Sequence, residues 1–186
     1  MDCSLRSVQS NSPCGLGLTA WQHQEGTDVR EQGNLNVLTG KTGMTAAVSE
    51  TLVRVNYSET DQMGVVYHAR YLVWLDVARC DHLRHSGMSY RELEEAGLRL
   101  VVSDVSIKYR QPARYDDLVR IRCWVRAVRS RKVEFGYVVE HADNGRVLAT
   151  ASTSLLALDT RMTLTRLPAR VSEVLHPIPD PVRLGE

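Results

Sequence analysis

Residues 69–86 have the sequence ARYLVWLDVARCDHLRHS, and this stretch decides how the rest of the chain can fold. It contains neither Pro nor Gly, and Gly87 follows it, so the pattern predicts a long α-helix with a glycine at its end. The first half of the helix, residues 71–75, is apolar on every side, whereas most of its charged residues come later. A helix end that is apolar all round must be enclosed, so we expect other parts of the chain to wrap around it.

Segments of alternating apolar and polar residues lie on both sides of this helix and predict β-strands. One strand is expected at residues 51–57, before the helix, and four more are expected within residues 101–158. The residues expected to face the core are Val53, Val55, Tyr57, Val101, Val105, Ile107, Tyr109, Val119, Ile121, Cys123, Val125, Ala127, Val133, Phe135, Tyr137 and Val139. Trp124 alternates with these residues and is expected on the opposite, polar face.

The connections between these elements complete the predicted fold. Reversals are expected at residues 112–117, 130–131 and 143–145. A short second helix is expected at residues 89–96, because Ser89 and Glu92 form a capping box and Gly97 can end it. Antiparallel neighbours joined by tight turns, with one enclosed helix, give an α+β fold. The simplest arrangement is a five-stranded antiparallel sheet wrapped around the long central helix.

The composition indicates one folded domain with less regular ends. The chain has 186 residues, 43% of them hydrophobic and 24% charged, which is typical of a single globular domain. Residues 1–47 show no helical or strand periodicity and are expected to form a flexible extension, so a chain beginning at Met44 should fold normally. The domain is expected at residues 48–176, and residues 177–186, which contain three of the six prolines, are expected to form a flexible tail.

Charge and apolar run length exclude two classes of partner. The net charge is +1, whereas a dedicated nucleic-acid binder carries a basic excess, so no nucleic-acid partner is expected. The longest apolar runs are about five residues, compared with the roughly 20 that a transmembrane helix needs, so no membrane insertion is expected.

The cysteine pattern and the start of the chain predict a cytoplasmic protein. Residues 1–10 lack the features of a signal peptide, and the four cysteines form no CxxC pair and no disulfide spacing. Asp81, His82 and His85 have a spacing that resembles a metal site, but no further ligand is evident, so a solvated or subunit-facing patch is favoured. No metal and no cofactor are expected.

Three stretches carry a resemblance to a known family. They are YSETDQMGVVYH at residues 57–68 with Tyr71 after it, WLDVAR at 74–79, and YRQPARYDD at 109–117. Together they resemble the hot-dog acyl-CoA thioesterases, in the 4-hydroxybenzoyl-CoA and YbgC-like group, over about residues 50–160. The resemblance implies a hot-dog fold, an acyl-CoA substrate, and a homodimer or homotetramer whose sites lie between subunits.

The same resemblance implies where the site lies. It gives Asp61 the role of the catalytic carboxylate, acting either as the nucleophile or as the base that activates water. It also gives the backbone N–H of His68, at the start of the central helix, the role of holding the thioester oxygen. The substrate-binding residues expected around them are Gly64, Val65, Val66, Tyr67 and Tyr71.

Physical chemistry supports this assignment. A helix N-terminus offers unpaired N–H groups and the positive end of the helix dipole, which suit an oxygen that gains negative charge. The helix begins about seven residues after Asp61, and Gly64 lets the chain turn back between them. A thiolate leaves readily, so no strong general acid is demanded, which fits the lack of a nearby Ser–His–Asp arrangement.

Several residues have more ordinary roles available. Asp61 can simply bond to its own turn, and Glu59, two residues away, is a second candidate for the base. The side chain of His68 can contact substrate or cap the helix. Tyr71 can belong to the core or line the acyl pocket.

The carrier and the activity also have alternatives. Arg129, Arg131 and Lys132, with Arg126, cluster at one predicted hairpin and can either pair with phosphates of coenzyme A or form a solvated turn. A non-catalytic hot-dog module that binds acyl groups or partners is the competing class, because a fold does not decide a function. A thioesterase acting on acyl-carrier protein would keep the chemistry and change the carrier. Neither the acyl chain nor its aromatic or aliphatic character follows from the sequence.

Overall fold

The computed structural model describes residues 47–182. Its elements in chain order are β1 (Ser49–Arg54), a 3₁₀ turn (Tyr57–Glu59), α1 (Arg70–His85), α2 (Tyr90–Glu95), β2 (Arg99–Tyr109), β3 (Leu118–Arg129), β4 (Lys132–His141), β5 (Val147–Leu158) and α3 (Ala169–Val174). The two predicted helices are confirmed to within a residue or two at each end. The predicted N-terminal extension lies outside the described residues apart from Ala47, and residues 183–186 of the predicted tail also lie outside them.

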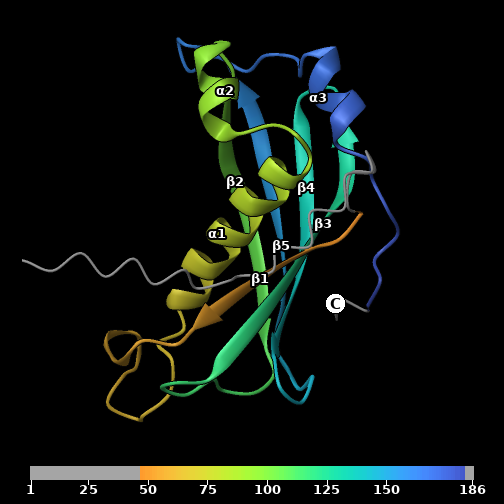
Figure 1. The fold of residues 1–186 in the computed structure, drawn as a ribbon. Coiled ribbons are helices and arrows are strands. Elements are labelled where there is room, and N and C mark those ends of the chain that lie inside the picture. The colour runs from red at the N-terminus through yellow and green to blue at the C-terminus, as the bar shows by residue number, and fades with distance from the viewer. Residues whose placement is uncertain (1–46, 183–186) are drawn as a thin grey trace, which may run out of the picture. The chain divides into compact units, whose positions relative to one another are not determined.

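The strands form one five-stranded antiparallel sheet, and α1 lies across one face of it (Figure 1). The predicted fold class is therefore confirmed. The strand order is β1-β3-β4-β5-β2, so the predicted meander is wrong for β2, which pairs with β5 and not with β3. The physical reason is that β1 and β4 occupy the two sides of β3, which leaves β5 as the open edge for β2.

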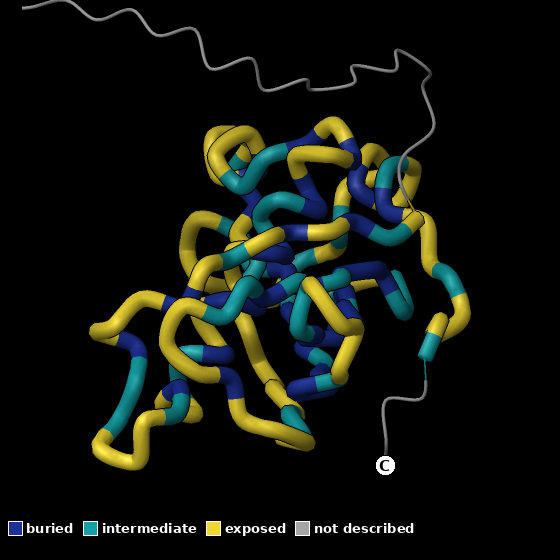
Figure 2. Tube along the Cα trace, turned by 60° about the horizontal axis from the view of Figure 1, so that its bottom comes forward, coloured by how far each residue is buried: buried dark blue, intermediate teal, exposed yellow. Residues whose placement is uncertain are grey.

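The core lies between α1 and the sheet. Tyr71, Trp74 and Leu75 of α1 belong to one buried hydrophobic cluster with alternating residues of β3 and β4. The core-facing residues predicted on these two strands are confirmed as buried, apart from the partly exposed Ala127: Val119, Ile121, Cys123, Val125, Val133, Phe135, Tyr137 and Val139. Buried segments gather at the centre of the described part of the chain, and the loops around them are exposed (Figure 2).

The predictions for the two outer strands are partly wrong. Tyr57 belongs to the 3₁₀ turn after β1 and is exposed, because the strand ends at Arg54. Val101 and Val105 of β2 are also exposed. β2 is an edge strand with an irregularity between Val102 and Asp104, and most of its residues are exposed on both faces. The alternation of apolar and polar residues does not reveal that, within one chain, no other element covers this edge strand.

The segment after α3 makes hydrogen bonds to β3. The Ile178 N–H donates to the carbonyl of Val125 at 3.0 Å, and the Asp180 carboxylate accepts from Trp124 Nε1 at 3.0 Å and from Arg126. Trp124 is therefore buried on the face where the sequence predicts exposed polar residues. Its ring lies over Gly136, where an added Cβ would stand 2.6 Å from the ring, so only glycine fits.

The residues that resemble a metal site by spacing are used for packing. His82 is buried, its Nδ1 lies 2.9 Å from Ser49 Oγ, and its ring meets Phe135 edge-on. Asp81 accepts from Thr51 and Arg84 instead. Within residues 47–182, no group of three or more His, Cys, Asp or Glu side chains is arranged to hold a metal ion. The helices of the same region include none that is both long and apolar enough to cross a membrane.

His82 makes the stability depend on pH. Burial, with a smaller contribution from His85, lowers the pKa of His82 to about 4, whereas an unfolded histidine titrates near ~6.5. Since the unfolded state binds the proton more readily, the free energy of unfolding should fall as the pH drops from ~6.5 to ~4, by roughly 3 kcal/mol in all. Urea unfolding across this range should show a weaker dependence in His82→Asn. The exposed His176→Asn is the control, because His176 does not contribute to the pKa of His82, and it should keep the wild-type dependence. Equal curves for all three proteins would refute the assignment.

Candidate active site

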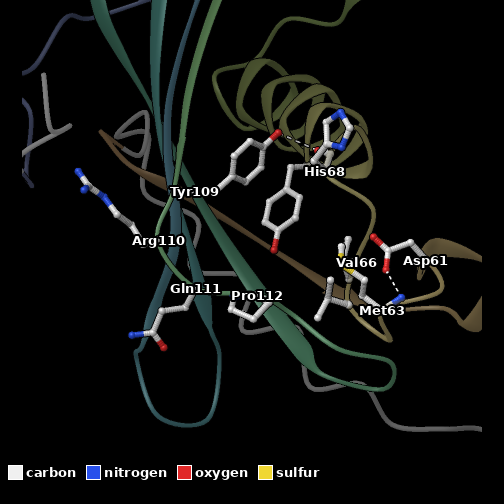
Figure 3. Close-up of a pocket in the computed structure, with 10 residues that line it drawn as sticks. Asp61, Met63, Val66, His68, Tyr109, Arg110, Gln111 and Pro112 are labelled. Atoms are coloured by element: carbon white, nitrogen blue, oxygen red, sulfur yellow. Dashed lines mark hydrogen bonds between the residues drawn. The ribbon is translucent and has the colours of Figure 1, made fainter.

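A pocket of about 310 Å³ lies beside the start of α1 (Figure 3). It is lined by Asp61, Met63, Val65, Val66, His68, Tyr71, Tyr109, Arg110, Gln111 and Pro112. Two parts of the chain that are distant in the sequence meet here: residues 61–71, which are the loop after β1 and the start of α1, and residues 109–112, which are the end of β2 and the connection that follows it. Of the substrate-binding residues expected around Asp61 and His68, Val65, Val66 and Tyr71 are in the lining, but Gly64 and Tyr67 are not.

The loop that carries Asp61 is a tight turn held by its own backbone. Asp61 N–H donates to the Val65 carbonyl and Gly64 N–H donates back to the Asp61 carbonyl, both at 2.9 Å. Gly64 has a φ of +72°, a backbone conformation that residues with a Cβ rarely adopt. The Val66 N–H donates to the Ala113 carbonyl at 2.9 Å and fixes the loop to the connection between β2 and β3. The turn therefore sets Asp61 in a defined place at the pocket wall.

The two oxygens of the Asp61 carboxylate are in different environments. One oxygen, Oδ1, accepts from the Met63 N–H at 2.8 Å, which is the ordinary turn-stabilising bond (Figure 3). For the other oxygen, Oδ2, the described residues provide no hydrogen-bond donor. The turn therefore orients the carboxylate and leaves Oδ2 available to a water molecule or a substrate.

The first turn of α1 leaves backbone donors unpaired. Arg70 N–H donates to the Tyr67 carbonyl at 2.8 Å and Leu72 N–H to the Ala69 carbonyl at 3.2 Å, so both bonds span three residues. Within residues 47–182, the backbone N–H groups of His68 and Ala69 find no acceptor. His68 lines the pocket, and its side chain is exposed and caps nothing. This is the arrangement in which a helix start can bind an anionic oxygen.

Glu59 is committed to holding the site together. Its side chain is 4% exposed and accepts from Asn56 N–H at 2.9 Å, Arg70 Nη2 at 2.9 Å and Trp74 Nε1 at 3.0 Å. Its carbonyl accepts from Tyr67 N–H at 2.9 Å. Burial acts to raise the pKa of Glu59, but these hydrogen bonds and the Arg70 charge outweigh it, so the pKa lies below its ordinary value. Glu59 is absent from the pocket lining, which favours Asp61 over Glu59 as the base.

We expect Glu59→Gln to destabilise the fold. The amide keeps the shape but loses the charge that Arg70 and Trp74 bind, so the free energy of unfolding should fall by about 2 kcal/mol. Urea unfolding at neutral pH measures this change. Glu50→Gln is a matched control, because that carboxylate is exposed and lies 3.5 Å from Arg120. Equal stability of the two variants would contradict the role given to Glu59.

Tyr71 and Tyr109 form the inner wall of the pocket. Their rings meet edge-on at 5.2 Å, and Tyr71 Oη accepts from the Ala113 N–H at 3.2 Å. Tyr71 is thus both a buried core residue and a pocket residue. Tyr109 was not predicted as a site residue, although the stretch 109–117 carries part of the family resemblance. That stretch was the available signal, because it also supplies the pocket residues Arg110, Gln111 and Pro112.

The basic hairpin does not reach this pocket within one chain. Arg129 and Lys132 are at the junction of β3 and β4, where both pair with Glu134. The pocket lies toward the other end of the sheet, since Tyr109 pairs with Ala149 at the start of β5 and Lys132 pairs with Leu156 near its end. About seven strand residues, roughly 24 Å, separate these two positions. Arg131 belongs to the same hairpin. Contacts of Arg129, Arg131 and Lys132 with coenzyme A therefore stay a prediction that requires the hairpin of another subunit.

Comparisons with known proteins identify the family. Residues 55–180 match the family model of the thioesterase-like superfamily. The acyl-CoA thioesterase YbgC of Haemophilus influenzae is 33% identical over 126 residues, covering 67% of this chain and 91% of that protein. The acyl-CoA thioester hydrolase YbgC of Shigella flexneri is 36% identical over 92 residues, covering 50% of this chain and 69% of that protein.

A solved structure agrees with these sequence relatives. The crystal structure of a hypothetical protein from Thermus thermophilus has a TM-score of 0.64 and 35% identity, and the match covers 68% of this chain and 94% of that one. The fold and the pocket define a hot-dog protein of the thioesterase class. The chain belongs to the thioesterase-like superfamily, and within it to the group of YbgC-like hot-dog thioesterases.

Proposed function

We propose that the protein hydrolyses an acyl-CoA thioester to a free carboxylic acid and coenzyme A. The observation that carries the proposal is the pairing, in one pocket, of the Asp61 carboxylate with the unpaired N–H of His68 at the start of α1. The names of the relatives support coenzyme A as the carrier. Val65, Val66 and Tyr71 would contact the acyl group, and Gly64 and Tyr67 would shape the loop around it.

The proposed chemistry has two forms that share the same groups. As a base, Asp61 takes a proton from water while the hydroxide adds to the carbonyl carbon. As a nucleophile, Asp61 adds to that carbon itself, and water then cleaves the resulting anhydride. In both forms the carbonyl oxygen gains negative charge beside the start of α1, and the C–S bond breaks to release the thiolate of coenzyme A.

We also propose that the active form is a homodimer or homotetramer. One chain leaves apolar residues exposed on the outer side of α1, among them Leu72, Val73 and Val77. It also leaves Val102 and Val105 exposed on the edge strand β2, which has unpaired backbone groups along one side. An exposed apolar edge strand invites pairing with another chain, and a two-fold partner covers such a patch most simply.

Two other parts of the proposal concern the carrier and the compartment. An acyl-carrier protein could present the same thioester, and a change of carrier would leave the chemistry of Asp61 unaltered. We propose a cytoplasmic location, since the described cysteines, Cys80 and Cys123, have free thiols, as is usual in a reducing compartment.

Thiol release from a substrate panel tests the proposed function. Short, long and aromatic acyl-CoAs should be incubated with the full chain, and the preferred acyl group should also be offered on acyl-carrier protein. Turnover that is fastest with a coenzyme A ester supports the proposal. Faster thiol release from the acyl-carrier protein would show that the preferred substrate is carried by that protein and not by coenzyme A. Binding of acyl-CoA without thiol release would instead favour a non-catalytic acyl-binding module.

A further inference from the structure

The carbonyl of His68 has an unusual partner. His68 lies one residue before the N-cap residue Ala69, so α1 itself provides no partner for this carbonyl. Here the Leu72 N–H donates to Ala69, and no other backbone N–H within residues 47–182 donates to the His68 carbonyl. The partner is instead the hydroxyl of Tyr109, which donates to this oxygen at 2.9 Å from the end of β2 (Figure 3).

This bond fixes the backbone at the point where the thioester oxygen would bind. The peptide group that carries the His68 N–H is held on its other side by the Arg70 N–H, which donates to the Tyr67 carbonyl at 2.8 Å. The next peptide group is held by Tyr109 through the His68 carbonyl. Since peptide groups are planar, fixing the two planes on either side of His68 fixes the direction of its N–H.

The Tyr109 hydroxyl can orient the backbone but cannot donate to substrate at the same time. A phenol has one proton to donate, and the His68 carbonyl receives it. Burial raises the pKa of Tyr109, so the hydroxyl stays protonated through the neutral range. The ring is 45% exposed and meets the rings of Tyr71 and His68 edge-on, so its packing is separable from its hydrogen bond.

We infer that Tyr109 is a positioning residue for the reaction: its hydroxyl holds the His68 carbonyl and thereby aims the His68 N–H at the thioester oxygen. The inference rests on the proposed function. The inference extends the proposed function, because it gives β2 a part in building the oxyanion site. β2 and β1 lie at opposite edges of the sheet. Small displacements of such a donor are costly, since catalysis depends on its place relative to the developing charge.

Tyr109→Phe tests this role by removing one oxygen atom. The value of kcat should fall about tenfold, the cost of one misdirected hydrogen bond, while KM changes less than about twofold. Tyr115→Phe is the matched control, because its exposed ring lies outside the pocket and its hydroxyl has no hydrogen-bond partner within the described residues. It should keep wild-type kcat. A Tyr109→Phe protein with wild-type kcat would overturn the inference, whether or not its melting temperature is lowered.

A spectroscopic readout separates this inference from the proposed activity. An acyl-CoA labelled with ¹³C at its carbonyl can be bound to Asp61→Asn, which preserves the ester, and its carbonyl stretch recorded by infrared difference spectroscopy. The stretch should move to lower frequency on binding, and by a smaller amount in Asp61→Asn/Tyr109→Phe. Equal shifts in the two proteins would overturn the role of Tyr109, whatever the rate of hydrolysis. A wild-type protein that releases no thiol would refute the proposed function alone.

Discussion

Asp61→Asn should lower kcat for the preferred acyl-CoA by at least about 100-fold and leave the fold intact. The amide oxygen can still accept from the Met63 N–H, so the turn that carries residue 61 is kept. What is lost is the negative charge, and with it the capacity to take a proton from water or to attack the carbonyl carbon. Positioned proton transfer alone contributes about 10²–10⁴-fold to rates, which sets the scale of the loss.

Two measurements make this result specific to Asp61. The melting temperature should stay within about 2 °C of wild type, which excludes unfolding as the cause. Asp143→Asn, the same chemical change in the exposed turn between β4 and β5, should leave kcat unaltered. If Asp61→Asn hydrolysed within a few-fold of wild type, the assignment would fail and Glu59 would become the leading candidate.

The second large effect concerns assembly. A lysine in place of Val105 puts a charge on the edge strand β2, where the side chain is 42% exposed in a single chain. We expect this variant to be a 20.9 kDa monomer by light scattering and to have no measurable thioesterase activity, since the family resemblance implies sites that two subunits share.

A charge on an exposed polar position away from the sheet edges provides the control. Ser172→Lys introduces the same charge on α3, where Ser172 is exposed, and should leave both the assembly and the activity unaltered. A 20.9 kDa species with wild-type turnover would refute both the predicted oligomer and the shared site.

The elements that the sequence predicts well are those whose signals are local. The capping box of α2 is present as predicted, with the Glu92 N–H donating to Ser89 Oγ at 3.2 Å. The buried faces of β3 and β4 follow from strict alternation, because a period of two places every second side chain on one side. The motif names Asp61 and His68 as site residues, and both line one pocket.

The features that the sequence does not reveal depend on distant partners. The position of β2 beside β5 follows from which strand edges remain open, and alternation carries no such information. The burial of Trp124 depends on Asp180, which is 56 residues away. The role of Glu59 depends on Arg70 and Trp74, which only the start of α1 brings to it. Tyr109 alternates like a core residue, yet its hydroxyl reaches His68, 41 residues earlier.

Hydrolysis in water enriched in ¹⁸O tests most directly whether the protein is an acyl-CoA thioesterase that works through Asp61. The full chain is incubated with the preferred acyl-CoA over many turnovers, and the acid and the released thiol are measured by mass spectrometry. The proposed mechanism predicts one ¹⁸O atom in the acid for each thiol released by wild type, and almost none of either product with Asp61→Asn. Acyl-CoA that binds and is recovered intact from the wild-type protein would contradict it.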